Sequence, residues 1–323
     1  MISCQSKQQQ LIDLSGEWEF RMDPNDLGVD EKWFEGDFLE SVQLPGSMVE
    51  NDKGYEITLE TEWTGGVRNP EWYNDPNYAP YVNTANIRFP YWLQPEKKYT
   101  GAAWYQKKFT VPSGWQEKTV WLTLERPHWE SVVWVNGEPL GTQNSLATPH
   151  VYDVTNFVHP GENRLTVRID NRTKDVDPGH NSHSITDHTQ SNWNGIAGEI
   201  SLEATGKIYF ENVEIFTDIE TKTAEIRASV QNNLPEPKTA EFTALATLKN
   251  TGEKLDKNKQ EFALAPGQNI VKINYELGDE ALLWDEFNPN VYRLDLELKS
   301  GKITDQASVD FGMREFKLDG TRF

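Results

Sequence analysis

The chain has 323 residues, with 31 lysine or arginine against 51 aspartate or glutamate, and a formal net charge of −20. A negative field of this size opposes binding to nucleic acids and to anionic membrane surfaces, so we expect neither as a partner. The length suggests about two domains with cores of their own. Because Cys4 is the single cysteine, no disulfide can form within the chain.

The first ten residues, MISCQSKQQQ, contain this cysteine. Cys4 follows Ile2-Ser3 and precedes a polar stretch, as at the cleavage site of a bacterial lipoprotein signal peptide. We therefore expect residues 1–10 to be a tether lipidated at Cys4, on a periplasmic or outer-membrane lipoprotein of the bacterial cell envelope. Only this anchor would touch a membrane. The charged and apolar parts of such a signal are missing, and the alternative is a frayed terminus with an incidental cysteine.

Residues 11–205 show the period-two alternation of half-buried strands. Examples are KTVWLTLE and the run that ends in Asn136-Gly137, a pair that strongly favours a hairpin turn. A Pro-Gly turn precedes the alternating residues Leu165, Val167 and Ile169. No long segment has helical periodicity. This part is predicted to be an antiparallel sandwich with long loops.

Residues 206–316 have a different character. About seven short alternating segments follow one another, from KIYFENVEIF to ITDQASVDFG, and they predict an immunoglobulin-like sandwich. Eleven of the twelve tryptophans precede Thr205, and only Trp284 follows it. The change in composition indicates two domains with different roles, and we expect the second to support the first.

Residues 317–323 contain the turn pair Asp319-Gly320, but three residues are too few for a return strand. An unfinished hairpin leaves backbone donors and acceptors unpaired. We therefore expect this segment to begin the link to a further domain.

Four segments in the same order resemble glycoside hydrolase family 2, which includes β-galactosidases, β-glucuronidases and β-mannosidases. They are LSGEWEF with VQLPGSM, TGAAWYQKKFTVP with VWVNGEPLG and YDVTNFVHPGENRLTVRI, NWNGIAGEISL, and LLWDEFNPNVYRLDLEL with VDFGMREF. The third segment departs from the family pattern, because one residue separates Trp193 from Gly195 and Gly198 stands where the family has arginine. The resemblance implies a galactose-binding-like jelly roll followed by an immunoglobulin-like sandwich.

The resemblance also implies what this chain does not contain. In the family, a catalytic (β/α)₈ barrel follows these domains and carries both catalytic glutamates, one of them in an Asn-Glu pair. This sequence has no Asn-Glu pair. Retaining glycosidases need two carboxyl groups about 5–5.5 Å apart. We nominate no catalytic residue and expect the chain alone to be inactive, with the barrel of the complete protein as its partner.

Loops of the family's jelly roll hydrogen-bond the terminal sugar through an Asn and an Asp. The segment TANIRFP matches the first of these and points to Asn86, and the nearest candidate for the second is Asp187. Carboxylates and amides hydrogen-bond sugar hydroxyls, and aromatic rings stack on sugar faces. The neighbours of Asp187 with suitable chemistry are therefore further sugar-binding candidates: His188, Gln190, Asn192 and Trp193.

Residues 62–92 hold eight aromatic residues beside Asn, Asp and Arg, and Pro and Gly prevent regular structure there. We favour a sugar-facing loop, because long loops in compact domains are usually functional. The alternative is that these rings fill the core beneath the loop.

His180, His183 and His188 invite a zinc site, and residues 175–181 are rich in oxygen ligands for calcium. Neither spacing matches a known metal motif. We assign no metal and no cofactor, and take the histidines as polar loop residues.

Three readings of the function are consistent with the sequence. The first is the carbohydrate-binding and scaffold part of a family 2 exo-β-glycosidase acting on a β-linked glycan, with a β-galactoside favoured because the candidate loops contain few basic residues. The second is a free-standing carbohydrate-binding lipoprotein. A pair of sandwiches with a purely structural role is the third reading.

Overall fold

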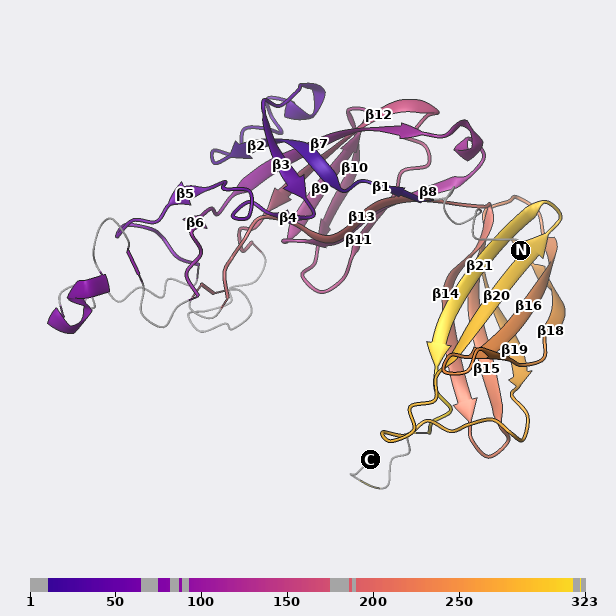
Figure 1. The fold of residues 1–323 in the computed structure, drawn as a ribbon. Helices are drawn as coiled ribbons and strands as arrows, with labels where there is room; N and C mark the ends of the chain where they lie inside the picture. The colour runs from indigo at the N-terminus through magenta and orange to yellow at the C-terminus, as the bar shows by residue number, and fades with distance from the viewer. Residues whose placement is uncertain are drawn as a thin grey trace. The chain divides into compact units, whose positions relative to one another are not determined.

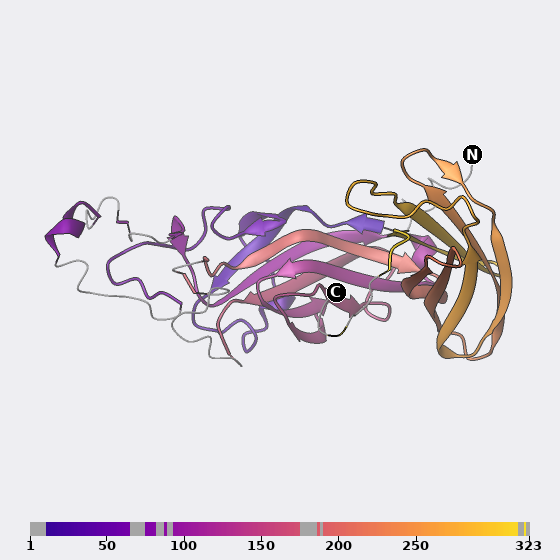
Figure 2. The same ribbon diagram turned by 90° about the horizontal axis from the view of Figure 1, so that it is seen from below.

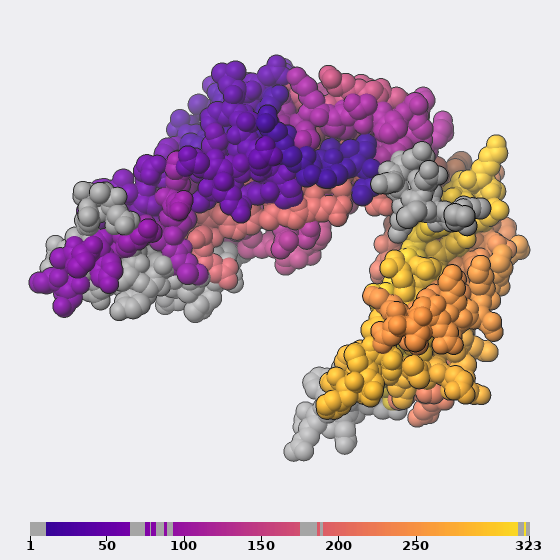
Figure 3. Space-filling model, in the orientation of Figure 1, coloured from indigo at the N-terminus to yellow at the C-terminus, as the bar shows by residue number. Residues whose placement is uncertain are grey.

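The computed structural model describes residues 11–64, 75–81, 87–88, 93–174, 186–187, 190–315 and 320. These residues form strands, turns and short 3-10 helices, with no α-helix among them, and the all-β prediction is confirmed. The chain divides into two compact units, residues 1–116 with 120–204, and residues 117–119 with 205–323. Figure 3 separates the units by colour, since the last part of the chain is orange to yellow. The described 3-10 helices are η1 (Trp33–Glu35), η3 (Pro76–Tyr81) and η4 (Ser113–Trp115).

The first unit is a sandwich of two sheets (Figures 1 and 2). One sheet has the order β1-β13-β8-β11, with β4 also paired to β13. The other has the order β10-β9-β12-β7-β2-β3. The strands of the first sheet are β1 (Leu11–Asp13), β4 (Gly46–Ser47), β8 (Thr119–Pro127), β11 (His150–Asp153) and β13 (Gly195–Thr205). Those of the second are β2 (Gly16–Asp23), β3 (Glu40–Leu44), β7 (Ala102–Val111), β9 (Glu130–Val135), β10 (Glu138–Asn144) and β12 (Gly161–Asp170). A short pair, β5 (Tyr55–Glu56) with β6 (Lys97–Lys98), lies outside both sheets.

The hairpin predicted at Asn136-Gly137 is confirmed. Val135 pairs with Glu138, so the turn has two residues between β9 and β10. Both turn residues have positive φ, 53° and 86°. Asn-Gly supplies this left-handed pair at low cost, and its twist matches that of the flanking strands.

The core of the first unit lies between its sheets, where alternate residues of each strand meet. Leu122, Val167 and Ile200 are among its fully buried members. A second, aromatic layer covers the outer face of the six-stranded sheet and is formed by Phe38, Trp104 and Trp134, with Trp33 and Phe34 packed against them. Because of this layer, the first five residues of β7 are buried on both faces.

Gly28 allows the aromatic layer to close. A Cβ atom at this position would lie 2.5 Å from the indole of Trp104. The same indole donates its Nε1–H to Asp23 (2.9 Å), which also accepts the amide N–H of Gly28 (2.9 Å). The segment between β2 and β3 is thus held against the sheet by one buried carboxylate.

A buried hydrogen-bonded cluster joins the two sheets of the first unit. Ser131, on β9, lies 2.6 Å from His150 Nδ1 and 2.7 Å from the Tyr152 hydroxyl, both on β11. His150 Nε2 faces the carbonyl of Ser145 (3.1 Å), so this nitrogen carries the proton and Nδ1 accepts from Ser131. Burial lowers the pKa of His150 and outweighs the hydrogen bond to Ser145, so the ring is neutral.

The second unit is also a sandwich, as predicted (Figure 1). One sheet has the order β14-β15-β19, with β14 (Ile208–Asp218), β15 (Thr223–Asn232) and β19 (Gly267–Glu276). The other has the order β17-β16-β20-β21, with β18 also paired to β16. Its strands are β16 (Lys238–Leu248), β17 (Glu253–Lys254), β18 (Asn258–Leu264), β20 (Tyr292–Ser300) and β21 (Ile303–Phe311).

Buried and more exposed residues alternate regularly along the strands β15 and β20 of this unit. Every second residue of β15 and of β20 is buried, among them Ile226 and Leu296. Trp284, in the loop before β20, donates its amide N–H to Met313 (3.0 Å), and Arg314 lies 4.5 Å above its ring. Gly312 lies directly against this indole, because a Cβ there would come within 2.9 Å of it.

Candidate functional site

The polar cluster around Asp187 is our candidate site, and it lies in the loop that leads into β13. Asp187 is fully buried. One carboxylate oxygen accepts the amide N–H of Thr64 (2.6 Å) and pairs with Lys98 Nζ (2.6 Å), while the other accepts the amide N–H of Asn192 (3.0 Å). The predicted Asp is therefore an anchor that ties three chain segments together.

Lys98 supplies the positive charge that pairs with the Asp187 carboxylate. It is on β6, its side chain is 6% exposed, and Nζ also reaches Thr64 Oγ1 (3.3 Å). The ring of Trp63 lies 5.7 Å from this nitrogen. Burial lowers the pKa of Lys98, and the charge of Asp187 opposes that shift. Two buried opposite charges with several hydrogen bonds are stable only as a pair.

Asn192 completes the cluster and has one unused group. Its amide nitrogen donates to Thr64 Oγ1 (2.9 Å) and to the carbonyl of Asn171 (3.1 Å). Its Oδ1 is buried and has no hydrogen-bond donor among the described residues. A buried acceptor without a donor costs about 1–3 kcal/mol, which makes this atom unusual in the cluster.

Trp193 is half-buried and stacks on His128, with ring centroids 4.6 Å apart and planes 16° from parallel. His128 Nδ1 lies 2.6 Å from the Trp193 carbonyl. A carbonyl only accepts, so Nδ1 carries the proton. Burial lowers the pKa of His128, the hydrogen bond to Trp193 opposes this, and the charge of Lys98 lowers it further.

Stability should depend on pH through the two buried histidines, His128 and His150. Their folded-state pKa values lie below the unfolded value of about 6.5, so the unfolded state binds more protons as the pH falls below 6.5. The histidine contribution is fully present above pH 6.5 and is lost as the pH falls through the folded-state pKa values. Urea unfolding at pH 7.5 and pH 5 should show a lower free energy of unfolding at pH 5. The control is His159→Gln, at an exposed histidine, which should show the same pH dependence as wild type. Equal stability of the wild-type protein at pH 7.5 and pH 5 would contradict the prediction.

Asn194 and Gly195 fix the entry into β13. Asn194 is buried, accepts from the Tyr105 hydroxyl (2.8 Å), and donates to the carbonyls of Gly101 and Ile169 (both 3.0 Å). Gly195 has φ of +144°, and a Cβ there would lie 2.3 Å from the carbonyl oxygen of Gly46. Glycine is required at this position by close contact between two backbones.

The predicted sugar-binding residues are placed unevenly. Asp187, Asn192 and Trp193 lie along the candidate loop, and Gln190 is exposed beside them with its amide N–H bonded to Thr186 (3.0 Å). Asn86 and His188 lie outside the described residues, as does most of the aromatic segment 62–92. Sequence reasoning missed three cluster members, Thr64, Lys98 and Asn171, because no local pattern marks them.

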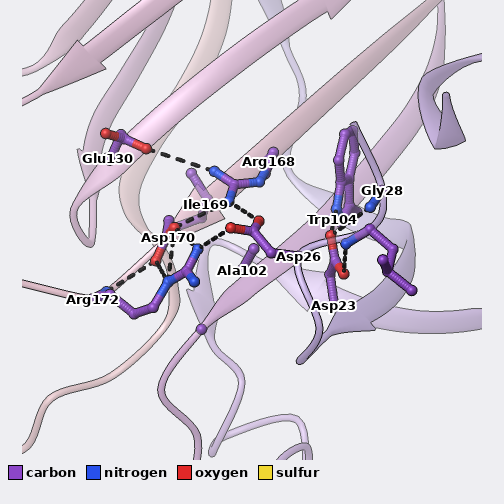
Figure 4. A network of polar contacts seen from close by, with 12 residues as sticks. Asp23, Asp26, Gly28, Ala102, Trp104, Glu130, Arg168, Ile169, Asp170 and Arg172 are labelled. Atoms are coloured by element: carbon purple, nitrogen blue, oxygen red, sulfur yellow. Dashed lines mark hydrogen bonds and ion pairs between the residues drawn. The ribbon is translucent and has the colours of Figure 1, made fainter. Parts of the chain in front are cut away.

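A second charged cluster lies at the end of β12 (Figure 4). Asp170 is fully buried and pairs with Arg168 (3.0 Å), Arg172 (2.5 Å) and Lys174 (3.0 Å). Burial alone would raise the pKa of Asp170, but the hydrogen bonds and charges of Arg172 and Lys174 outweigh it and hold the pKa well below its ordinary value. Asp26 and Glu130 supply further anions, so three cations meet three anions.

Across the stretches that the structure describes, no helix combines the length and apolar character needed to cross a membrane. The same stretches contain no group of three or more His, Cys, Asp or Glu side chains arranged to hold a metal ion. His180, His183 and residues 175–181 lie outside the described residues, so the structure does not test the zinc and calcium sites considered from the sequence.

Comparison with known proteins agrees with this architecture. Residues 50–206 match the sugar binding domain of glycosyl hydrolases family 2, and residues 208–314 match a second domain described as glycosyl hydrolases family 2. The two sandwiches are therefore a sugar-binding-type jelly roll and an immunoglobulin-like domain. The chain belongs to glycosyl hydrolase family 2, as its sequence motifs predicted.

Two curated relatives and one solved structure illustrate the similarity. A β-glucuronidase of Paenibacillus borealis is 23% identical over 97% of this chain and 47% of its own length. A β-galactosidase of Priestia megaterium is 24% identical over 94% of this chain and 28% of its own length. The calcium binding mutant D341A D367A of Bacteroides uniformis β-glucuronidase 2 shares the fold with a TM-score of 0.69 and 22% identity, over 96% of this chain and 33% of that one. The chain thus spans half or less of the length of these relatives.

Proposed function

We propose that this chain is the carbohydrate-binding and scaffold part of a family 2 exo-β-glycosidase whose catalytic barrel lies in a further domain. The match of residues 50–206 to the family's sugar-binding domain carries this proposal. The buried Asp187–Lys98 pair supports it, because it fixes the loop that bears the candidate residues Asn192 and Trp193. The chain supplies one wall of the sugar site, and the barrel supplies the carboxylates.

For the sugar we propose a β-galactoside. The strong negative charge of the chain opposes the approach of an anionic sugar. A β-glucuronide is the second candidate, because similar proteins include β-glucuronidases as well as β-galactosidases. Assays of the complete protein with nitrophenyl β-galactoside and nitrophenyl β-glucuronide decide between them.

The 323-residue chain alone should hydrolyse neither substrate, because both catalytic carboxylates of the mechanism are proposed to lie in the barrel. Because the chain is proposed to form only one wall of the pocket, it should bind sugars with dissociation constants no lower than about 1 mM. This corresponds to a binding free energy on the order of −4 kcal/mol. Turnover by the purified chain well above the blank would contradict the proposal that the catalytic carboxylates lie in the barrel.

A free-standing carbohydrate-binding lipoprotein is the competing function. The DNA downstream of codon 323 distinguishes the two, since the glycosidase requires a barrel with an Asn-Glu pair there. The anchor at Cys4 stays a prediction, because residues 1–10 lie outside the described residues. Radiolabelled palmitate should label the native protein and not its Cys4→Ala variant.

A further inference from the structure

The loop before β20 in the second unit, residues 282–290, exposes large apolar side chains. Phe287 is 93% exposed, and Leu282 and Leu283 are also exposed. Trp284, the next residue, borders an open hollow of about 310 Å³ whose other lining residues are Val291, Asp310, Phe311, Gly312 and Arg314. Single exposed apolar residues are common, but several large ones gathered beside a hollow are typical of a surface that a partner covers.

Hydrogen bonds fix the shape of the 282–290 loop. Asp285 Oδ1 accepts the amide N–H groups of Phe287 (2.8 Å) and Asn288 (2.7 Å), and the Asp285 N–H donates to the Asn288 carbonyl (3.2 Å). The Asn290 side chain donates to the Leu283 carbonyl (2.9 Å). Because the backbone around Phe287 is already ordered, docking requires little further ordering of the loop. An aromatic side chain held in this way is typical of the anchor residues of protein interfaces.

The last described strand of the second unit leads the chain out against this loop. Trp284 donates its N–H to the Met313 carbonyl (3.0 Å), and the Arg314 guanidinium lies 4.5 Å from the centroid of the Trp284 ring. Residues 316–323, eight in all, can extend at most about 29 Å from Glu315. A domain joined after residue 323 is therefore tethered close to the 282–290 loop.

We propose that the 282–290 loop docks the catalytic barrel of the complete protein, with Phe287 as the anchor in an apolar pocket of the barrel. The inference rests on the proposed function, because it assumes that a barrel follows residue 323. The tether favours the barrel as the occupant, since a linked domain meets the loop at an effective concentration in the millimolar range. A second copy of the chain is disfavoured, because two chains with a net charge of −20 repel each other.

Thiol labelling of the complete protein tests this docking. In a Cys4→Ser background, Leu282→Cys places a reporter thiol in the loop, and Ile270→Cys places one on β19, where the native side chain is 68% exposed. Peptide mass spectrometry measures maleimide modification at each position. The thiol at position 282 should react at least about tenfold more slowly than the thiol at position 270, because the reagent reaches it only while the interface is open.

Removing the anchor should expose the reporter. Phe287→Ala in the Leu282→Cys protein should raise the labelling rate at position 282 toward the rate at position 270. The variant should fold, because a side chain as exposed as Phe287 adds little to the stability of its own unit. Phe216→Ala is the matched control, since Phe216 is another exposed phenylalanine of this unit, on β14. It should leave both labelling rates unchanged.

The contrary outcomes are distinct from one another. In a protein that hydrolyses a β-glycoside, equal labelling rates at positions 282 and 270 overturn the docking and leave the proposed function intact. Slow labelling at position 282 that Phe287→Ala does not change overturns the role of Phe287 as the anchor. Slow labelling that becomes fast when the protein is diluted identifies a second copy as the occupant and overturns the barrel. If the complete protein hydrolyses no β-glycoside, the proposed function fails, and the docking of a catalytic barrel fails with it.

Discussion

Replacing Asp170 by alanine should lower the free energy of unfolding of the first unit by about 3–5 kcal/mol, because the change takes from the buried Arg168 its one fully buried anion among the described residues. Arg168 is 6% exposed, and its Nε already has no acceptor among the described residues. For a domain of this size, the loss corresponds to a fall in Tm on the order of 10 °C. Differential scanning calorimetry of the two proteins measures it.

Asp37→Ala is the control for this experiment. The Asp37 side chain is 68% exposed and lies 3.7 Å from Lys108 and 3.6 Å from Arg164, as a surface ion pair. Exposed pairs contribute little, so this variant should stay close to wild type. If the Tm of Asp170→Ala were as close to the wild-type value as that of Asp37→Ala, the charged cluster of Figure 4 would contribute little to stability.

Replacing Lys98 by methionine should cost a similar amount, about 3–5 kcal/mol, because the Asp187 carboxylate then stays buried without a countercharge. Urea unfolding of wild type and variant at pH 7.5 measures this loss.

Lys97→Met provides the comparison, because Lys97 is the neighbouring residue of β6 and pairs at the surface with Asp52, whose side chain is 88% exposed. This variant should unfold like wild type. A Lys98→Met protein as stable as wild type would show that the buried Lys98–Asp187 pair adds no net stability.

The fold was largely predictable because its signals are local. Alternation and the Asn136-Gly137 turn depend on neighbouring residues, and both sandwiches follow from them. The burial of Trp104 on the outer face of its sheet was not predictable, since it results from the segment between β2 and β3 folding over that face.

The site was predictable only in part. Asp187, Asn192 and Trp193 were nominated from composition and family resemblance, but the sequence did not show that Asp187 is fully buried. Its partners Lys98 and Thr64 are 89 and 123 residues away along the chain. No pattern in one sequence joins positions that distant, because the contact is created by the tertiary fold.

The uneven placement of the indoles makes the two units separately observable in solution. Eleven tryptophans precede Thr205, and Trp284, held between Gly312 and Arg314, is alone after it. In a Trp284→Phe variant, tryptophan fluorescence would come from the first unit alone, while far-ultraviolet circular dichroism would follow the strands of both. Two coincident denaturation curves would then indicate that both sandwiches unfold as one cooperative system, and two displaced curves that each melts by itself.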